Sequence, residues 1–132
     1  MAELTYPLSE SGREAVRTAS GKPVSEITLE AVLGGEMSAA DLRVGPQTLA
    51  LQADFAEESG NPQLAENLRR GAELVAFGDD ELLRFYEMLR PGRSSAAELD
   101  ELAKSLAERG AERCAELVRG AGAAYVRRGL IA

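Results

Sequence analysis

The sequence predicts an all-α fold, a single small domain of about six helices with an extended N-terminal arm. Three observations lead to this prediction. Alanine and leucine dominate the apolar residues, with 22 and 18 copies against nine isoleucines and valines together, and both lose little side-chain freedom in a helix. Apolar residues recur three and four positions apart, and no segment alternates as a strand does. The intervening loops are short, which makes neighbouring helices mostly antiparallel.

Residues 1–24 are predicted to form the arm. The segment Tyr6-Pro7-Leu8 should be extended, because a residue before proline is forced out of the helical region. A short helix is possible from Ser9 to Ala19, and Thr18–Pro23 has the composition of a turn. Apolar residues are sparse here, so the arm is either a frayed terminus or a segment that lies across a partner.

Residues 25–132 are predicted to form the helical domain. Ser25 can cap a helix that runs through Leu33 and ends at Gly34-Gly35. Ser38 to Asp41 has the pattern of a capping motif over a single turn. Pro46 can open the next helix, which runs to about Ser59 and carries Leu49, Ala50, Ala53 and Ala56 on one face, with Leu51 and Phe55 on a second.

Two helices follow in the middle of the chain. Asn61 can cap the first, with Pro62 at its first position, and Gly78 can end it in a left-handed conformation. Asp79 or Asp80 can cap the second, which Pro91-Gly92 ends. Its predicted apolar face comprises Leu82, Phe85, Tyr86 and Leu89.

The last two helices have clear ends. Ser94 or Ser95 can cap a helix that Gly110 ends, with Leu99, Leu102, Ala103 and Leu106 at helical spacing. The final helix should run from about Ala111 to Arg128 and end at Gly129. Its apolar face includes Cys114, which predicts a buried thiol.

Composition excludes several classes of protein. The 15 basic and 22 acidic side chains give a net charge of −7 without a basic stripe, so nucleic acid should bind weakly. No apolar run reaches the length of a membrane span, and no signal-peptide hydrophobic region is present. A single cysteine is typical of a reducing cytoplasm.

The sequence contains no histidine. This excludes Ser–His and Cys–His nucleophile pairs and the H-E-x-x-H metal motif, so catalysis by the chain alone is not expected. Asp79-Asp80-Glu81 could hold a cation, but acidic residues at a helix start are more simply explained by the exposed N–H groups there. We therefore expect no catalytic, cofactor-binding or metal-binding residue.

A binding surface is the better prediction. Leu83 and Met88 fall outside the apolar face of their helix, so the helix carries more apolar surface than one core contact needs. Arg90 and Arg93 flank a rigid Pro-Gly turn and could pair with a partner's carboxylates, although a solvated turn is an equal alternative. The candidate interface residues are Tyr6, Leu8, Leu51, Phe55, Leu83, Met88, Arg90 and Arg93.

Several segments also resemble the small (gamma) subunit of the coenzyme B12-dependent diol and glycerol dehydratases. The similar segments, in order along the chain, are YPLSE from Tyr6, VRTASGKP from Val16, ITLEAVLGGEMSAADLR from Ile27, PQLAENLRR from Pro62, AEL from Ala72, EMLRPGR from Glu87 and YVRRGL from Tyr125. Matches at so many places in the same order make a chance resemblance improbable. Gly71 and Gly78 stand where alanine and proline are expected in that family.

The resemblance implies a helical subunit that assembles with a large TIM-barrel subunit and a medium subunit, typically as a dimer of heterotrimers. Adenosylcobalamin would be bound by those partners, and the reaction would be dehydration of a 1,2-diol or glycerol to an aldehyde. Members with a longer N-terminal extension are in some systems packaged in bacterial microcompartments. Only five residues precede Tyr6 here, so the resemblance predicts no such targeting by this chain. The alternative is a free-standing helical adaptor or regulatory domain.

Overall fold

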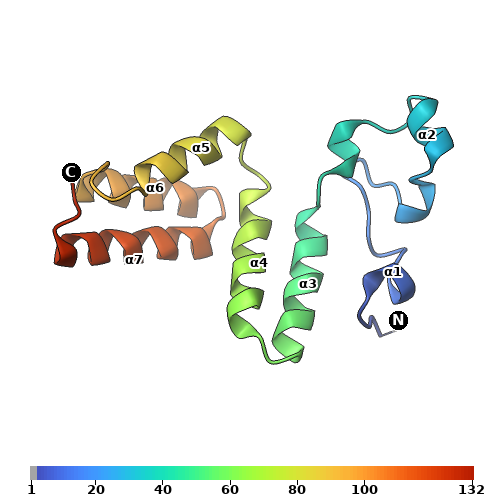
Figure 1. The fold of residues 1–132 in the computed structure, drawn as a ribbon, viewed down its shortest axis with the longest axis horizontal. Coiled ribbons are helices and arrows are strands. Elements are labelled where there is room, and N and C mark those ends of the chain that lie inside the picture. Colours follow the sequence, from blue (N-terminus) through green and yellow to red (C-terminus); the bar gives the residue numbers. More distant parts are fainter. Residues whose placement is uncertain (1–2) are drawn as a thin grey trace. The chain divides into compact units, whose positions relative to one another are not determined.

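The computed structural model describes residues 3–132, and the all-α prediction is confirmed (Figure 1). The described residues contain seven α-helices and two 3-10 helices. The elements are α1 (Leu8–Ser11), η1 (Val24–Glu26), α2 (Leu29–Leu33), η2 (Ala39–Leu42), α3 (Pro46–Glu58), α4 (Pro62–Leu74), α5 (Asp79–Met88), α6 (Ala96–Glu108) and α7 (Glu112–Arg128). They divide into two compact units, Met1–Ala72 and Glu73–Ala132.

The helix starts follow local capping chemistry. Asn61 Oδ1 accepts the Leu64 backbone N–H at 3.2 Å, and Ser95 Oγ accepts that of Glu98 at 3.2 Å, which confirms both predicted caps. Pro46 and Pro62 occupy the first positions of α3 and α4, where no N–H is needed. The terminal glycine of α7, Gly129, is left-handed with φ 67°.

Three predicted boundaries are wrong. The helix expected from Ser9 to Ala19 is only the single turn α1, after which Arg17 and Pro23 form an isolated antiparallel bridge. The helix expected from Ser25 begins at Leu29 instead, because Thr28 provides the cap and accepts the Ala31 N–H at 3.1 Å. The third error concerns a glycine.

Gly78 does not end α4 in a left-handed conformation. Its φ of −73° and ψ of 159° are extended, and it stands at the N-cap of α5. The backbone N–H of Gly78 donates to Glu81 Oε2 at 3.0 Å, so a glutamate in the first turn closes this helix start. Asp79 and Asp80 therefore lie inside the first turn and do not cap it.

The first unit is built around a small alanine core. α3 and α4 run side by side, and Ala53, Ala56 and Ala65 are buried between them with Leu68 packed against the cluster (Figure 1). Arg69 pairs with Asp54 at 3.2 Å and also with Glu57, which joins the same two helices at their surface. Alanine lets the helices approach closely but provides little apolar area.

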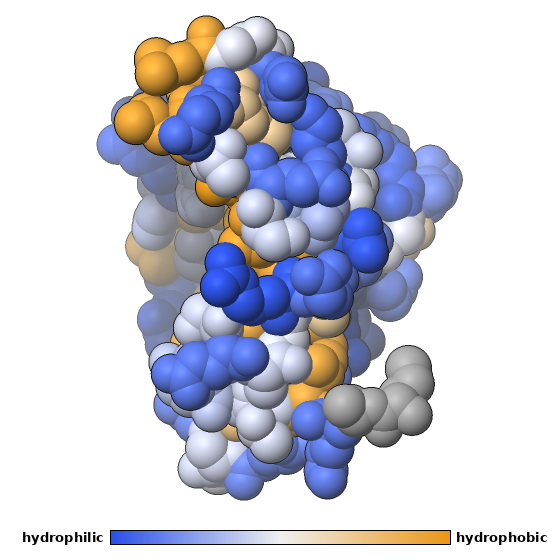
Figure 2. All heavy atoms as spheres, turned by 90° about the vertical axis from the view of Figure 1, so that its right-hand side faces the viewer, coloured by the Kyte–Doolittle hydropathy of each residue, from blue (hydrophilic) through white to orange (hydrophobic). Residues whose placement is uncertain are grey.

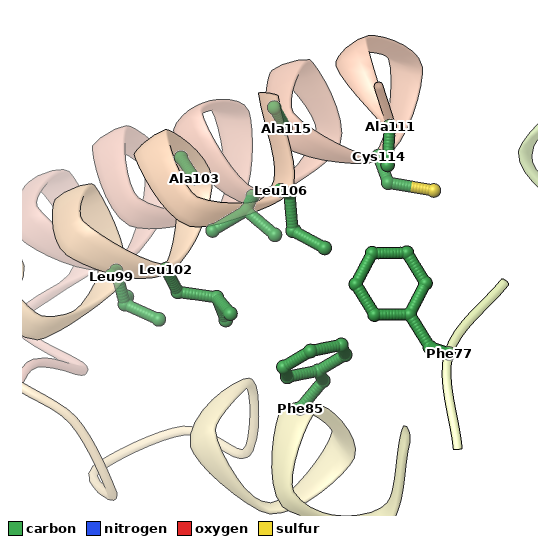
Figure 3. Packing of buried hydrophobic residues seen from close by; sticks show 10 residues of the cluster. Phe77, Phe85, Leu99, Leu102, Ala103, Leu106, Ala111, Cys114 and Ala115 are labelled. Carbon is green, nitrogen blue, oxygen red and sulfur yellow. The ribbon is translucent and has the colours of Figure 1, made fainter. Parts of the chain in front are cut away.

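The second unit has a larger core (Figure 3). α6 and α7 pack together, and Leu99, Leu102 and Leu106 point from α6 toward Phe77 and Phe85. The two phenyl rings meet edge-to-face with centroids 5.5 Å apart. Cys114 is buried in the same cluster, as its place on the apolar face predicted.

Candidate subunit interface

Three candidate interface residues lie around one hollow in the first unit. The hollow has a volume of about 950 Å³ and is open to solvent, and its lining includes Tyr6, Leu8 and Phe55. Residues of the arm form one side of it and residues of α3 and α4 form the other. The rings of Tyr6 and Phe55 meet edge-to-face with centroids 6.1 Å apart, yet Tyr6 remains 80% exposed. Leu51 is half-buried on α3 and is not among the residues that line this hollow.

The arm that carries Tyr6 is fixed locally. The backbone N–H of Thr5 donates to Ser11 Oγ at 3.0 Å, and the Ser11 hydroxyl in turn donates to the Thr5 carbonyl. The arm thus lines one side of the hollow, and the Tyr6 ring stays largely exposed although its edge meets Phe55. An apolar hollow with one exposed tyrosine is suited to contact with another protein chain.

The two candidates on α5 have different environments. Leu83 is 66% exposed, as predicted for a residue off the core face. The prediction that Met88 also points away from the core is wrong, because Met88 packs against the buried cluster together with Tyr125 and Ile131. Tyr86, which was predicted on the core face, is exposed. Only Leu83 of the candidate pair is available as surplus apolar surface.

Arg90 and Arg93 share one carboxylate within the chain. Arg90 Nη1 lies 2.9 Å from Glu87 Oε2, and Arg93 Nε lies 3.4 Å from Glu87 Oε1. The hydrogen bond from Arg90 and the two positive charges lower the pKa of Glu87. Two guanidinium groups against one carboxylate leave a net positive charge and several unused N–H donors, so the turn can still bind a carboxylate of another protein.

The turn itself is rigid. The Gly92 N–H donates to the Leu130 carbonyl at 2.7 Å, and the Ala132 N–H donates to the Ser94 carbonyl at 3.0 Å. Gly92 has φ 75°, which a residue with a Cβ would adopt only under strain. The C-terminal residues therefore hold the Arg90–Arg93 turn in one shape.

The acidic start of α5 serves the fold. Glu81 Oε1 accepts Arg109 Nη1 at 2.6 Å, and the Arg109 guanidinium lies 3.9 Å from the centroid of the Phe77 ring. The Arg109 hydrogen bond, followed by that from the Gly78 N–H, lowers the pKa of Glu81. Among residues 3–132, no group of three or more metal-ligating side chains has the geometry to hold an ion.

Sequence reasoning missed one apolar surface, on α2. Leu29, Val32 and Leu33 are all exposed there, and none of them was among the candidate interface residues. A signal was present, because three large aliphatic residues in five positions exceed what so short a helix can bury.

Comparison with known proteins places this chain in a family. The sequence model of the dehydratase small subunit family matches residues 1–132. The chain belongs to this family. It is 45% identical over 124 residues to the propanediol dehydratase small subunit of Citrobacter freundii. It is 44% identical over 124 residues to the propanediol dehydratase small subunit of Salmonella typhimurium.

Each alignment covers 93% of this chain and 72% of the relative. The resemblance seen in the sequence is thereby confirmed, and the chain is a small subunit of a dehydratase, a hydro-lyase. No helix in the described part of the chain is long and apolar enough to cross a membrane.

Proposed function

We propose that this chain is the non-catalytic small subunit of an adenosylcobalamin-dependent dehydratase that converts a 1,2-diol or glycerol to an aldehyde and water. The observation that carries the proposal is the 45% identity, over 93% of the chain, to a propanediol dehydratase small subunit. In this proposal the chain packs on a TIM-barrel large subunit, and a medium subunit completes a heterotrimer that pairs into a dimer. In this proposal the assembly works in the cytoplasm, either free or enclosed in a bacterial microcompartment.

The residues of this chain do not fit the cofactor. The sequence has no histidine to offer cobalt a nitrogen ligand, and the hollow beside Tyr6 is open and mainly apolar. We therefore assign adenosylcobalamin and substrate to the partner subunits and derive no chemical step for this chain. Its contribution is a surface: the Tyr6 hollow, Leu83 and the Arg90–Arg93 turn are the parts that support a packing role.

Co-expression tests the proposal. The chain is produced with the large and medium subunits of a propanediol dehydratase, and the mixture is separated by size-exclusion chromatography and assayed for cobalamin-dependent aldehyde formation. The proposal predicts co-elution of all three chains and activity that is lost when this chain is omitted. A chain that elutes alone, with full activity in its absence, would support the free-standing adaptor instead.

Residue-level variants test its non-catalytic character. Asp79→Ala, Asp80→Ala and Cys114→Ala should each leave the activity of the assembled complex within about threefold of the unmodified enzyme, because none of the three is proposed to touch substrate or cofactor. A loss of several orders of magnitude with assembly intact would contradict this. Charge reversal by Arg90→Glu with Arg93→Glu should weaken assembly, and unchanged assembly would remove the turn from the interface.

A further inference from the structure

The α2 helix presents its large side chains to solvent. Leu29 and Leu33 are 69% and 78% exposed and lie four positions apart, with Val32 beside them on the same face. We call Leu29, Val32 and Leu33 the α2 face. The residue of α2 that is buried is the small Ala31. Figure 1 draws α2 at the upper right. Figure 2 shows the molecule from that right-hand side, and apolar surface is visible at its top.

Hydrogen bonds hold the backbone of α2 in place, and the side chains of this face are exposed in that conformation. Thr28 caps the start of α2, the Gly34 N–H donates to the Glu30 carbonyl at 2.8 Å, and the Glu36 N–H donates to the Ala31 carbonyl at 2.9 Å. The Lys22 ammonium donates to the Glu36 carbonyl, which joins the end of this segment to the preceding turn. These hydrogen bonds hold the backbone of the segment in one conformation, in which the large aliphatic side chains are not buried.

Acidic side chains outnumber basic ones in the segment that carries the α2 face. Residues 22–36 contain three exposed glutamates, Glu26, Glu30 and Glu36, against one basic residue, Lys22, whose ammonium donates to the Glu36 carbonyl. None of these three carboxylates forms an ion pair within the part of the chain that the structure describes. In the same unit, by contrast, the Asp54 and Glu57 carboxylates are paired with Arg69.

The excess of glutamates near the α2 face indicates which kind of partner can bind there. A second copy of the chain, docked face to face, would bring the same three glutamates against one another, and like charges oppose such a contact. An anionic membrane surface or a nucleic acid would be repelled for the same reason. The complementary surface is an apolar hollow bordered by lysine or arginine on a different protein.

We propose that the α2 face docks into such a hollow on the large subunit of the dehydratase. This inference rests on the proposed function, which supplies the large subunit as the partner, and it adds which surface of this chain makes the contact and what chemistry receives it. The aliphatic side chains provide the buried centre, and the glutamates meet basic residues at the rim.

Paired variants in the full complex test the apolar centre. Leu29→Gln with Leu33→Gln removes the face while it keeps side-chain length and helix propensity. Leu117→Gln with Val126→Gln on α7 is the matched control, because both residues are also exposed. Each chain is titrated against the large and medium subunits, and circular dichroism checks that helix content is unchanged. The α2 pair should weaken binding at least about tenfold, and the control pair should stay within about twofold.

A charge-reversal pair tests the rim. Glu26→Lys with Glu30→Lys should weaken binding to the large subunit at least about fivefold at low salt, and the difference should shrink at high salt. Glu108→Lys with Glu116→Lys makes the same change of charge at exposed positions elsewhere and should have a smaller effect.

The outcomes separate this inference from the proposed function. If the unmodified chain does not join the complex, the proposed function fails. If it joins and the Leu29/Leu33 variant binds equally well, only the α2-face assignment is overturned. Salt-independent loss in the Glu26/Glu30 variant would overturn the basic rim, and self-association that disappears in the Leu29/Leu33 variant would overturn the large subunit as the occupant.

Discussion

The strongest stability prediction concerns Glu73, which caps α7 although it lies 40 residues before the first N–H that it accepts. Glu73 Oε1 accepts the Arg113 N–H at 3.1 Å and Oε2 accepts the Cys114 N–H at 2.9 Å. Ala111 stands at the N-cap position and has no side-chain oxygen to offer. One carboxylate therefore satisfies two of the N–H groups that a helix start leaves open, and its negative charge also faces the positive end of the helix.

Glu73→Gln keeps the shape but removes the charge and one acceptor. A lost hydrogen bond costs about 1 kcal/mol and the loss of charge at a helix start about 0.5 kcal/mol, so the free energy of unfolding should fall by about 1.5 kcal/mol. For a chain of this size the midpoint of thermal unfolding should fall by roughly 5 °C. Urea unfolding of the full chain, followed by circular dichroism at neutral pH, measures the change.

Glu116→Gln is the matched control, since Glu116 is exposed on the same helix. This variant should change the free energy of unfolding by less than about 0.5 kcal/mol. If both variants unfold at the same urea concentration, Glu73 does not cap α7 in solution and the reasoning is refuted.

Three further predictions follow from local geometry. Gly120→Ala should stabilise α7 by about 0.5–1 kcal/mol in urea unfolding, because a Cβ there would meet nothing within 4 Å and alanine favours helix; a destabilised variant would contradict this. The pKa of Asp41 is lowered to about 2, first by the Ser20 hydroxyl, so its contribution to stability is complete above about pH 3.8 and is lost as the pH falls through about 2. Ser20→Ala should raise that pKa in an NMR titration, and an unchanged value would exclude the hydrogen bond. Arg109→Gln should likewise raise the pKa of Glu81 toward its ordinary value of 4.5, and no shift would show that the pair is broken in solution.

Local signals were sufficient where a residue acts on its own neighbours. Asn61 and Ser95 cap helices that start one residue later, and Gly129 ends the helix before it, so sequence order alone revealed these ends. Gly78 failed because one glycine between two helices can end the first or start the second, and the Glu81 carboxylate decided for the start. The Glu73 cap could not be predicted from local sequence, since its partners lie 40 and 41 residues away.

The candidate interface shows the same limit. Periodicity identified Leu83 as exposed, because a helix wheel describes a single helix correctly. It failed for Met88, since the core cluster also receives Tyr125 and Ile131 from the end of the chain and extends beyond the face that α5 alone defines. The family resemblance came from residue identities along the whole chain, which is why it identified the role while the position of each contact stayed a prediction.

The two units bury different kinds of side chain, and this difference helps to explain why leucines are exposed in the first unit. The second unit buries leucines and phenylalanines in one cluster, whereas the buried residues of the α3–α4 contact are alanines. At about 25 cal/mol per Å² of apolar area, an alanine contributes far less than a leucine, so the first unit gains little from its own core. The same unit leaves Leu29 and Leu33 exposed on a backbone that hydrogen bonds hold in shape. A segment with large aliphatic side chains outside and small ones inside reaches its full stability when another surface covers it. This behaviour is expected of a subunit that completes an assembly while its partners carry out the chemistry.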